Sequence, residues 1–334
     1  MANYSSLEIC AGAGGQALGL EQAGFEHLEL VELELMACHT LQLNRPEWKV
    51  LRRDVKNYSA AHLKGQVDLF AGGVPCPPFS IAGKQLGQDD ERDLFPEVIR
   101  LAAECNPKAV MIENVKGILS PKFNEYRKFI IQQLNDLGYE CDWRLLNASD
   151  YGVSQLRPRA ILVGLKREYF HFFRWPEKVK GKTKTVGELL YSEMAKAGWE
   201  KAEQWKEKAK TIAPTLVGGS KKHGGADLGP TRAKQAWEGL GVCGKGLADA
   251  PPQPGFEGLP RLTLGMAALI QGFPKNWQFA GKKTPGYRQV GNAFPPPVAK
   301  AVGKSIIDAF IEAEKWQKEK KAPKQNLENT LLRM

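Results

Sequence analysis

The chain lacks both a membrane-spanning stretch and a secretion signal. No apolar run approaches the roughly 20 residues that a helix needs to cross a bilayer. The start Met1-Ala2-Asn3-Tyr4-Ser5-Ser6 has no basic segment followed by an apolar one. We therefore expect a soluble protein that is not exported and has no membrane partner.

Cysteine and histidine patterns typical of metal sites are also missing. The six cysteines are scattered, no two of them have two-residue spacing, and no histidine pair stands beside them. This argues against a zinc site or a disulfide scaffold, and we expect no bound metal. The glycine motif ending in Lys-Ser/Thr that cradles a triphosphate is absent as well.

Positive charge is what the chain has in excess. It carries 47 Lys and Arg against 37 Asp and Glu, a net charge of +10, which favours a polyanionic partner. Between Lys166 and Lys184 there are seven basic residues and two acidic ones. Aromatic residues at 169–175 interrupt this run, so a plain solvated face explains it poorly.

The 334 residues, 43% of them hydrophobic, are enough for about two domains. Strand-like and helix-like segments alternate up to about residue 166, which predicts a layered α/β domain. The expected strands are 7–9, 27–32, 50–54, 67–71, 109–112, 140–146 and 160–165, and the expected helices are 16–23, 33–44, 94–105 and 123–137. A smaller domain follows to about 286, with one polar helix near 186–210, and an apolar helical pattern from 289 to 310 returns to the first domain.

The stretch Val74-Pro75-Cys76-Pro77-Pro78-Phe79-Ser80 presents one thiol on a proline-rich loop. Its three prolines fix φ and remove backbone donors, so neither a helix nor a central strand can run through it. The buried strand predicted at 67–71 and two glycines come just before it. Cys76 therefore lies just past the carboxyl end of a strand, where open α/β sheets bind ligands.

A glycine turn, Ala11-Gly12-Ala13-Gly14-Gly15, follows the first predicted strand and opens a helix. Backbone amides can approach a ligand in this setting, although a turn without a ligand explains the motif alone equally well. Glu32 and Asp54 end the next two strands at the same edge, and an acid at the second strand can accept hydrogen bonds from ribose hydroxyls. These residues favour a cofactor that contains ribose and adenine.

Two further groups of polar residues adjoin predicted strands. Glu113 ends the strand that follows the Cys76 loop, so both side chains could face one pocket, although Glu113 alone would suit an ordinary surface position. Gln155, Arg157 and Arg159 enter the last strand, and alternation places them on one side. Guanidinium groups there suit carboxylate, carbonyl or phosphate acceptors.

Taken in order, these segments resemble the DNA (cytosine-5) methyltransferase family, in its bacterial restriction-modification form. The matching motifs are Glu8-Ile9-Cys10-Ala11-Gly12-Ala13-Gly14-Gly15, Gly73-Val74-Pro75-Cys76, Glu113-Asn114-Val115, Gln155 with Arg157 and Arg159, Leu269-Ile270-Gln271-Gly272-Phe273-Pro274, and Gln289-Val290-Gly291-Asn292. The match spans residues 5 to about 310, except for a variable segment of about 167–258.

The resemblance implies an α/β fold of the Rossmann-like S-adenosylmethionine-dependent methyltransferase type, with a mixed seven-stranded sheet and a smaller target-recognition domain. The implied division is a catalytic domain at 1–168, completed by 287–320, a target-recognition domain at 169–286 and a polar tail at 321–334. S-adenosylmethionine is the implied cofactor and S-adenosylhomocysteine the product. The implied cofactor-binding residues are Cys10, Ala11, Gly12, Ala13, Gly14, Gly15, Glu32, Leu33, Asp54, Val55, Asn292 and Phe294. In this set Glu32 takes the ribose hydroxyls and Asp54 the adenine amine.

The resemblance also implies the chemistry. The thiolate of Cys76 adds to C6 of a cytosine flipped out of duplex DNA, Glu113 stabilises or protonates N3, and Arg159 holds O2, with Arg157 in the same catalytic set. The implied DNA-binding residues are Ser80, Lys84, Gln85, Gln155, Thr215, Lys221, Lys222 and Arg232, the first three of them on a loop expected to close over the DNA. A single small recognition region argues for a short DNA site.

Three positions depart from the family pattern. Cys10 stands where a phenylalanine is usual, Pro77 where glutamine commonly follows the nucleophile, and Leu33 where an aromatic residue often packs on adenine. None of them removes a reacting group. We further expect a monomer in the bacterial cytoplasm, with a separately encoded restriction endonuclease as a possible partner.

Four other functions compete with this one. A tRNA cytosine-5 methyltransferase belongs to a branch of the same family, but the basic, aromatic recognition segment favours duplex DNA. A catalytically silent DNA-binding relative would not need Cys76, Glu113, Arg157 and Arg159. An NAD-dependent oxidoreductase leaves the Pro75-Cys76 loop unexplained. A zinc cytidine deaminase needs a second cysteine two residues on and a His-x-Glu sequence, and both are missing.

Overall fold

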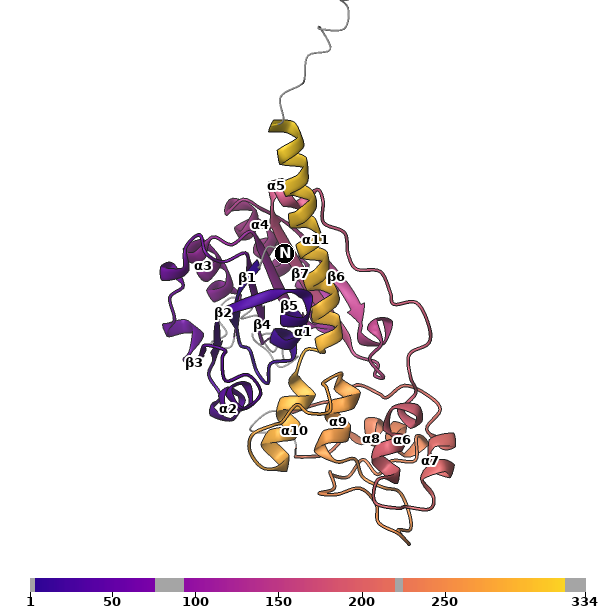
Figure 1. Cartoon of the computed structure of the whole chain (residues 1–334). Coiled ribbons are helices and arrows are strands. Elements are labelled where there is room, and N and C mark those ends of the chain that lie inside the picture. The colour runs from indigo at the N-terminus through magenta and orange to yellow at the C-terminus, as the bar shows by residue number, and fades with distance from the viewer. Residues whose placement is uncertain (1–3, 76–92, 220–224, 322–334) are drawn as a thin grey trace, which may run out of the picture.

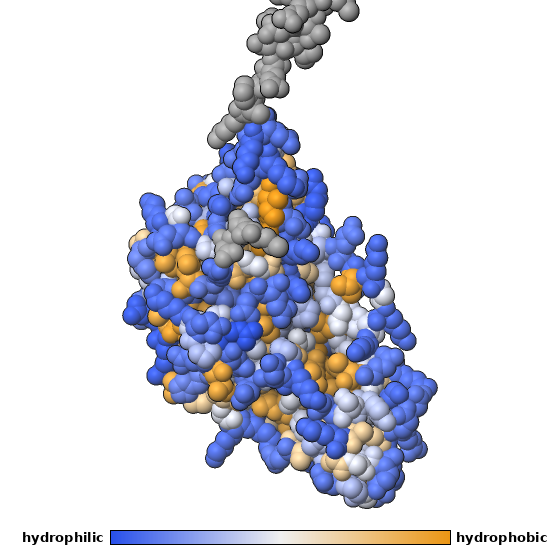
Figure 2. Space-filling model, viewed as in Figure 1, coloured by the Kyte–Doolittle hydropathy of each residue, from blue (hydrophilic) through white to orange (hydrophobic). Residues whose placement is uncertain are grey.

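The computed structural model describes residues 4–75, 93–219 and 225–321. Within these ranges, no helix is long and apolar enough to cross a membrane. Hydrophilic side chains cover most of the face seen in Figure 2. The predicted residues Cys76, Ser80, Lys84, Gln85, Lys221 and Lys222 lie outside the described residues.

A seven-stranded mixed sheet forms the centre of the larger domain, in the order β3-β2-β1-β4-β5-β7-β6, which confirms the predicted fold class. The first five strands in this order run parallel, and β7 is antiparallel to both of its neighbours. The strands are β1 Tyr4–Ile9, β2 Phe25–Glu32, β3 Val50–Arg52, β4 Leu69–Gly73, β5 Ala109–Val115, β6 Tyr139–Asn147 and β7 Pro158–Lys166. Each overlaps a strand expected from the sequence.

Helices cover both faces of the sheet. One face packs on α3 and α4 and the other on α1, α5 and the long helix α11, which Figure 1 shows running along the sheet. The helices are α1 Gly15–Ala23, α2 Leu35–Asn44, α3 Phe95–Cys105, α4 Asn124–Asp136, α5 Arg167–Phe170, α6 Val186–Ala195, α7 Ala202–Lys208, α8 Thr231–Gly239, α9 Leu264–Gln271, α10 Lys283–Asn292 and α11 Pro296–Lys321. Short 3₁₀ turns occur at Val55–Asn57, Ala61–Leu63, Lys116–Leu119, Pro121–Phe123 and Ala148–Tyr151.

The smaller domain is built from α6 to α10, which gather at one end of the molecule in Figure 1. Its core is continuous with the first domain, because Trp277 packs near Trp48, with 6.2 Å between ring centroids. The Nε1 atom of Trp277 also donates to the carbonyl of Ala13 in the glycine turn, at 3.2 Å. The two domains therefore meet at the glycine turn.

Two predicted helices are each divided in the structure. The segment expected as one helix near 186–210 is split into α6 and α7 around Gly198, whose φ of 88° is left-handed and cannot continue a helix. The pattern from 289 onward is split between α10 and α11 at Pro295 and Pro296, since proline lacks the backbone donor that a continuous helix needs.

The aromatic residues at 169–175 do not belong to the core of the smaller domain. Tyr169 packs on Phe310 of α11 and Phe172 on Trp316, with ring centroids 5.2 and 6.0 Å apart. These side chains join the core on the α11 face of the sheet. The first residues of the predicted recognition segment therefore pack with the larger domain, and the chain reaches the smaller domain only after them.

Candidate active site

A cavity of about 620 Å³ lies where the strand order changes direction, beyond the carboxyl end of β1 between β2 and β4. This is the position at which open α/β sheets bind ligands. Of the predicted cofactor residues, those lining the cavity are Cys10, Ala11, Gly12, Ala13, Gly15, Glu32, Asn292 and Phe294. The others, which do not line it, are Gly14, Leu33, Asp54 and Val55.

The turn between β1 and α1 is shaped by left-handed residues. Gly14 caps α1 with a φ of 81°, and Cys10 has a φ of 52°, which is uncommon for a residue with a side chain. Burial raises the pKa of the Cys10 thiol, and the nearby carboxylates of Glu32, Glu8 and Asp54 add to the rise. These surroundings favour the neutral thiol of Cys10 in the cavity wall.

Glu32 connects this turn to the end of β2. Its Oε2 accepts a hydrogen bond from the amide of Gly12 at 2.7 Å, and its Oε1 accepts one from the amide of Glu34 at 2.7 Å. Burial raises the pKa of Glu32, although these backbone donors oppose the rise. The bonds fix the carboxylate in the cavity wall, where its remaining lone pairs can accept from a ligand hydroxyl.

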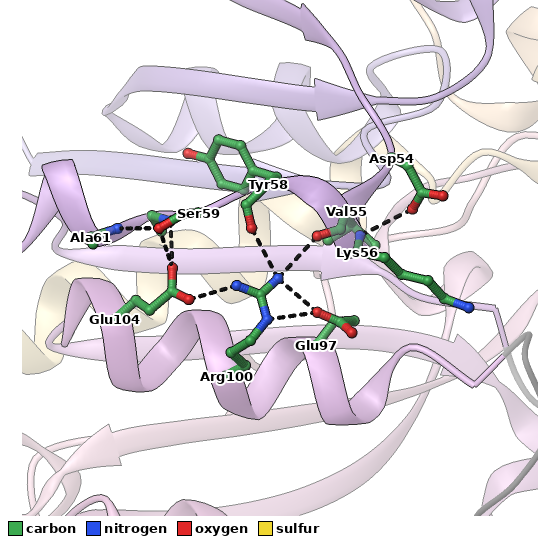
Figure 3. A network of polar contacts seen from close by, with 10 residues as sticks. Asp54, Val55, Lys56, Tyr58, Ser59, Ala61, Glu97, Arg100 and Glu104 are labelled. Atoms are coloured by element: carbon green, nitrogen blue, oxygen red, sulfur yellow. Dashed lines mark hydrogen bonds and ion pairs between the residues drawn. The ribbon is translucent and has the colours of Figure 1, made fainter.

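Asp54 and Val55 do not line the cavity, and the backbone at Val55 is bound by Arg100 of α3. Arg100 donates to the carbonyls of Val55 and Tyr58 at 3.0 and 2.9 Å, as Figure 3 shows. The Oδ1 atom of Asp54 accepts from the amide of Lys56 at 3.0 Å and caps a short 3₁₀ turn. Arg100 thus positions the segment that follows β3.

Glu8 and Gln16 line the cavity, and the sequence analysis assigned neither of them a role. Glu8 is 1% exposed and Gln16 is 4% exposed. Within the described residues, the side-chain oxygens and nitrogen of this pair reach no partner in good hydrogen-bond geometry, although the two side chains lie close enough to each other to interact. Burial raises the pKa of Glu8 well above its ordinary value, and the adjacent Gln16 only opposes the rise. The sequence feature that could have identified Glu8 is an acidic residue between the apolar Leu7 and Ile9 at the end of β1.

Glu113 lines the same cavity and forms an ion pair with Arg159. The Nε atom of Arg159 lies 2.6 Å from Oε1 of Glu113, and Glu113 lines the cavity together with Gly73 at the end of β4. Burial raises the pKa of Glu113, while Arg159 and Arg157 oppose the rise. The pair combines a carboxyl group whose pKa is shifted with a guanidinium. Such groups can stabilise charge that develops on a substrate during a reaction.

The strand end that leads to Cys76 is fixed beside this pair. Gly73 pairs with Glu113 across β4 and β5, and the Nδ2 atom of Asn114 donates to the carbonyl of Val74 at 3.1 Å. Cys76, two residues further along, lies outside the described residues.

Gln155 and Arg157 do not share the environment of Arg159. Arg157 is fully buried and donates to the carbonyls of Leu216 and Gly291 at 2.8 and 2.7 Å. Gln155, also fully buried, accepts from the amide of Leu216 at 2.7 Å and donates to Oε1 of Gln271 at 2.7 Å. This placement does not match a direct DNA contact for Gln155 or a reacting role for Arg157, because α9, α10 and the 213–217 segment cover both side chains.

The two remaining residues predicted to bind DNA differ in their surroundings. Thr215 is half-buried, and its hydroxyl donates to the carbonyl of Leu156. Arg232 is exposed near the start of α8. Among the described residues, no group of three His, Cys, Asp or Glu side chains could hold a metal ion.

Comparison with known proteins shows what the chain is similar to. The family model described as C-5 cytosine-specific DNA methylase matches residues 4–308. The type II methyltransferase M.NgoMIV of Neisseria gonorrhoeae is 57% identical over 313 residues, which cover 92% of this chain and 98% of the relative. The type II methyltransferase M.NaeI of Lentzea aerocolonigenes is 56% identical over 317 residues, covering 93% of this chain and 76% of the relative.

Solved structures agree in fold. The Entamoeba histolytica methyltransferase EhMeth aligns with a TM-score of 0.65 at 17% identity, over 93% of this chain and 99% of that one. A mutant of Spodoptera frugiperda DNMT2 aligns with a TM-score of 0.62 at 19% identity, over 92% and 99%. Because this family model spans all seven strands of the sheet and the smaller domain, the chain belongs to the C-5 cytosine-specific DNA methylase family.

Proposed function

We propose that the protein methylates C5 of one cytosine within a short DNA sequence, as the methyltransferase of a type II restriction-modification system. The observation that carries this is the Glu113–Arg159 pair: Glu113 lines the cavity, and both it and Gly73, its strand partner, adjoin the strand end that leads to Cys76. The family match and the two type II relatives, both more than half identical to the chain, support the same activity.

S-adenosylmethionine fits the cavity in size and chemistry. A volume of about 620 Å³ lies in the range of cofactor sites. The orphaned carboxyl group of Glu8 can receive an ammonium group, Glu32 can accept from ribose hydroxyls, and Met36 provides apolar lining. When bound, this cofactor supplies an electrophilic methyl group on a sulfonium centre.

The residues of the chain then make cytosine reactive. C5 of cytosine is too weak a nucleophile to attack a sulfonium methyl group unaided, so Cys76 adds its thiolate to C6 and turns C5 into an enamine carbon. Glu113 stabilises or protonates N3 as electrons reach it, and Arg159 holds the O2 carbonyl. Once C5 carries the methyl group, loss of its proton to a base would expel the thiolate and restore the aromatic ring. Because C6 is inaccessible inside a stacked duplex, the base must leave the helix, at a cost of a few kcal/mol.

The protein is expected to act as a monomer in the bacterial cytoplasm, where its DNA substrate lies. A separately encoded restriction endonuclease would cut the same sequence when it is unmethylated. The net charge of +10 supports binding to duplex DNA, and binding should weaken steeply with salt because phosphate neutralisation releases counterions.

A methylation assay tests the proposal. The protein is incubated with labelled S-adenosylmethionine and plasmid DNA, and the methylated base is mapped by sequencing. We expect 5-methylcytosine at one short sequence and no incorporation with Cys76→Ser. A parallel reaction with tRNA tests the RNA branch of the family. Absence of C5 methylation on any duplex, or full activity of Cys76→Ser, would refute the proposal.

A further inference from the structure

The connection between the two domains carries a series of exposed lysines. It leaves α5, passes the outer strand β6 and reaches α6, as Figure 1 shows. Lysines occupy every second position in its last part, residues 178–184, and all four are exposed. This part, the lysine strap, contains no acidic residue. The aromatic residues that precede it pack into the core on the α11 face, so the two halves of the basic run have different surroundings.

The strap is bound at two points to the turn that follows β6. The amide of Val179 donates to the carbonyl of Asp150 at 2.9 Å. The hydroxyl of Thr183 donates to the carbonyl of Ser149 at 2.8 Å. Both anchors are odd-numbered residues, whereas the lysines occupy the even positions and remain exposed. The structure therefore fixes the strap along one edge of the larger domain and leaves its ammonium groups in solvent.

Most of the positive charge on the strap is not neutralised by the protein itself. The Nζ atom of Lys178 lies 3.1 Å from Oδ2 of Asp150. Within the described residues, the other three lysines form no ion pair. The carboxylate of Glu188 accepts from the amide of Thr185 at 2.7 Å, which lowers the pKa of Glu188, and two lysines of the strap add to this effect. Three ammonium groups thus remain available to a polyanion.

The anchors of the strap lie at the same edge of the sheet as the proposed reacting groups. Leu146 of β6 lies opposite Arg159, and Ser149 and Asp150 follow it by three and four residues. At about 3.6 Å per residue and about 5 Å between strands, these anchors are within roughly 20 Å of Arg159. A duplex advances about 3.4 Å per base pair, so this distance corresponds to at most about six base pairs from the flipped cytosine.

We propose that the lysine strap is a DNA-binding surface that contacts phosphates of the duplex beside the recognition sequence. This inference rests on the proposed function, because its partner is the duplex whose cytosine meets Glu113 and Arg159. Ammonium groups neutralise phosphates without reading base edges, so the strap adds affinity and orientation but no sequence preference. Because the strap leads directly into α6, a duplex bound there lies beside both domains.

The salt dependence of DNA binding tests the proposal. A labelled duplex of about 40 base pairs, centred on the sequence mapped in the methylation assay, is titrated with the full chain at several salt concentrations, and binding is followed by fluorescence anisotropy. The triple variant Lys180→Gln, Lys182→Gln and Lys184→Gln should bind at least about tenfold more weakly at low salt. The slope of log K against log salt should fall in magnitude by about 2 to 3, because each lost phosphate contact removes about 0.9.

A second triple variant controls for the loss of net charge. Lys300→Gln, Lys304→Gln and Lys318→Gln remove the same charge from exposed positions on α11, which covers one face of the sheet. This variant should change the slope by less than about 1. In methylation assays, the defect of the strap variant should appear in KM for DNA rather than in the rate at saturation, and the methylated sequence should stay the same.

The outcomes separate this inference from the proposed function. Equal salt slopes for the strap variant and the α11 variant would refute the strap as a DNA contact, while C5 methylation by the wild-type protein would still stand. A changed methylated sequence would also contradict the inference, because phosphate contacts carry no base information. Strap-dependent binding of tRNA that is tighter than binding of the duplex would overturn DNA as the partner. If wild-type protein methylates no duplex, the proposed function falls first.

Discussion

Arg159 and Glu113 form an ion pair across the antiparallel strands β5 and β7, with 2.6 Å between Nε and Oε1. Their side chains are 13% and 12% exposed, so water screens the pair little. Arg159 thereby opposes the burial that raises the pKa of Glu113. The pair holds a carboxyl group and a guanidinium at fixed positions where the proposed cytosine must present N3 and O2.

Replacing Glu113 should therefore impair chemistry more than binding. Glu113→Gln keeps the shape of the side chain but removes the group proposed to serve N3, so the single-turnover methylation rate should fall by about 10²-fold or more. The affinity for S-adenosylhomocysteine, measured by calorimetry, should stay within about twofold, a small free-energy difference. A methylation rate close to wild type would show that Glu113 has no part in the reaction.

Arg157 and Arg159 should respond differently to the same substitution. Arg157→Lys replaces a planar group that serves two buried carbonyls with a single ammonium group, and leaving one carbonyl unpaired costs about 1–3 kcal/mol. Urea unfolding should show this loss of stability. Arg159→Lys, at the partner of Glu113, should instead lower the methylation rate in single-turnover assays. Equal losses of stability in both variants would contradict the distinction between them.

The strands and their common edge could be predicted from sequence because their signals are local. Each buried strand is a short apolar run that ends at a glycine, an acid or a turn, and this placed Glu32 correctly at the end of β2, whereas β5 continues two residues past Glu113 to Val115. The difference between Arg157 and Arg159 could not be predicted. Alternation gives the face of a strand, but the partners of Arg157 are Leu216 and Gly291, 59 and 134 residues away.

The aromatic residues at 169–175 were assigned to the recognition segment because their packing partners are also distant in sequence. Their partners Phe310 and Trp316 come from the last helix, so no local pattern identifies them. The two divided helices are different, since Gly198 and the prolines at 295–297 are local breakers visible in the sequence. That Glu8 and Gln16 lack hydrogen-bond partners could not be predicted from sequence either, because it depends on every residue that surrounds the cavity.

The start of α2 offers a direct test of which side chain faces the cofactor. Leu33, predicted to take the adenine-packing position, is 55% exposed and does not line the cavity, whereas Met36 does. Met36→Ala should weaken S-adenosylhomocysteine binding by roughly tenfold or more, since burying a side chain of this size contributes about 1.5–3 kcal/mol. Leu33→Ala should change the affinity by less than about twofold. The reverse order in calorimetry would restore Leu33 as the packing residue.

Glu8 should make the stability of the cofactor-free protein depend on pH. Burial raises its folded-state pKa well above its ordinary value. Between the ordinary value and the folded value, the folded state binds more protons than the unfolded state, so the free energy of unfolding falls as pH rises. Each pH unit in this window costs at most about 1.4 kcal/mol. Below the ordinary pKa both states are protonated, and the penalty is absent.

Glu8→Gln should remove this penalty while keeping the size of the side chain. Urea unfolding without cofactor should show the variant gaining stability over wild type as pH rises above the ordinary carboxyl value, with little difference at lower pH. Glu125→Gln on α4, where the side chain is 85% exposed, controls for removing a negative charge from the surface. A gap between Glu8→Gln and wild type that stayed constant or narrowed with rising pH would mean that Glu8 ionises in the folded protein without penalty. The orphaned carboxyl group in the cavity would then need a partner other than the cofactor.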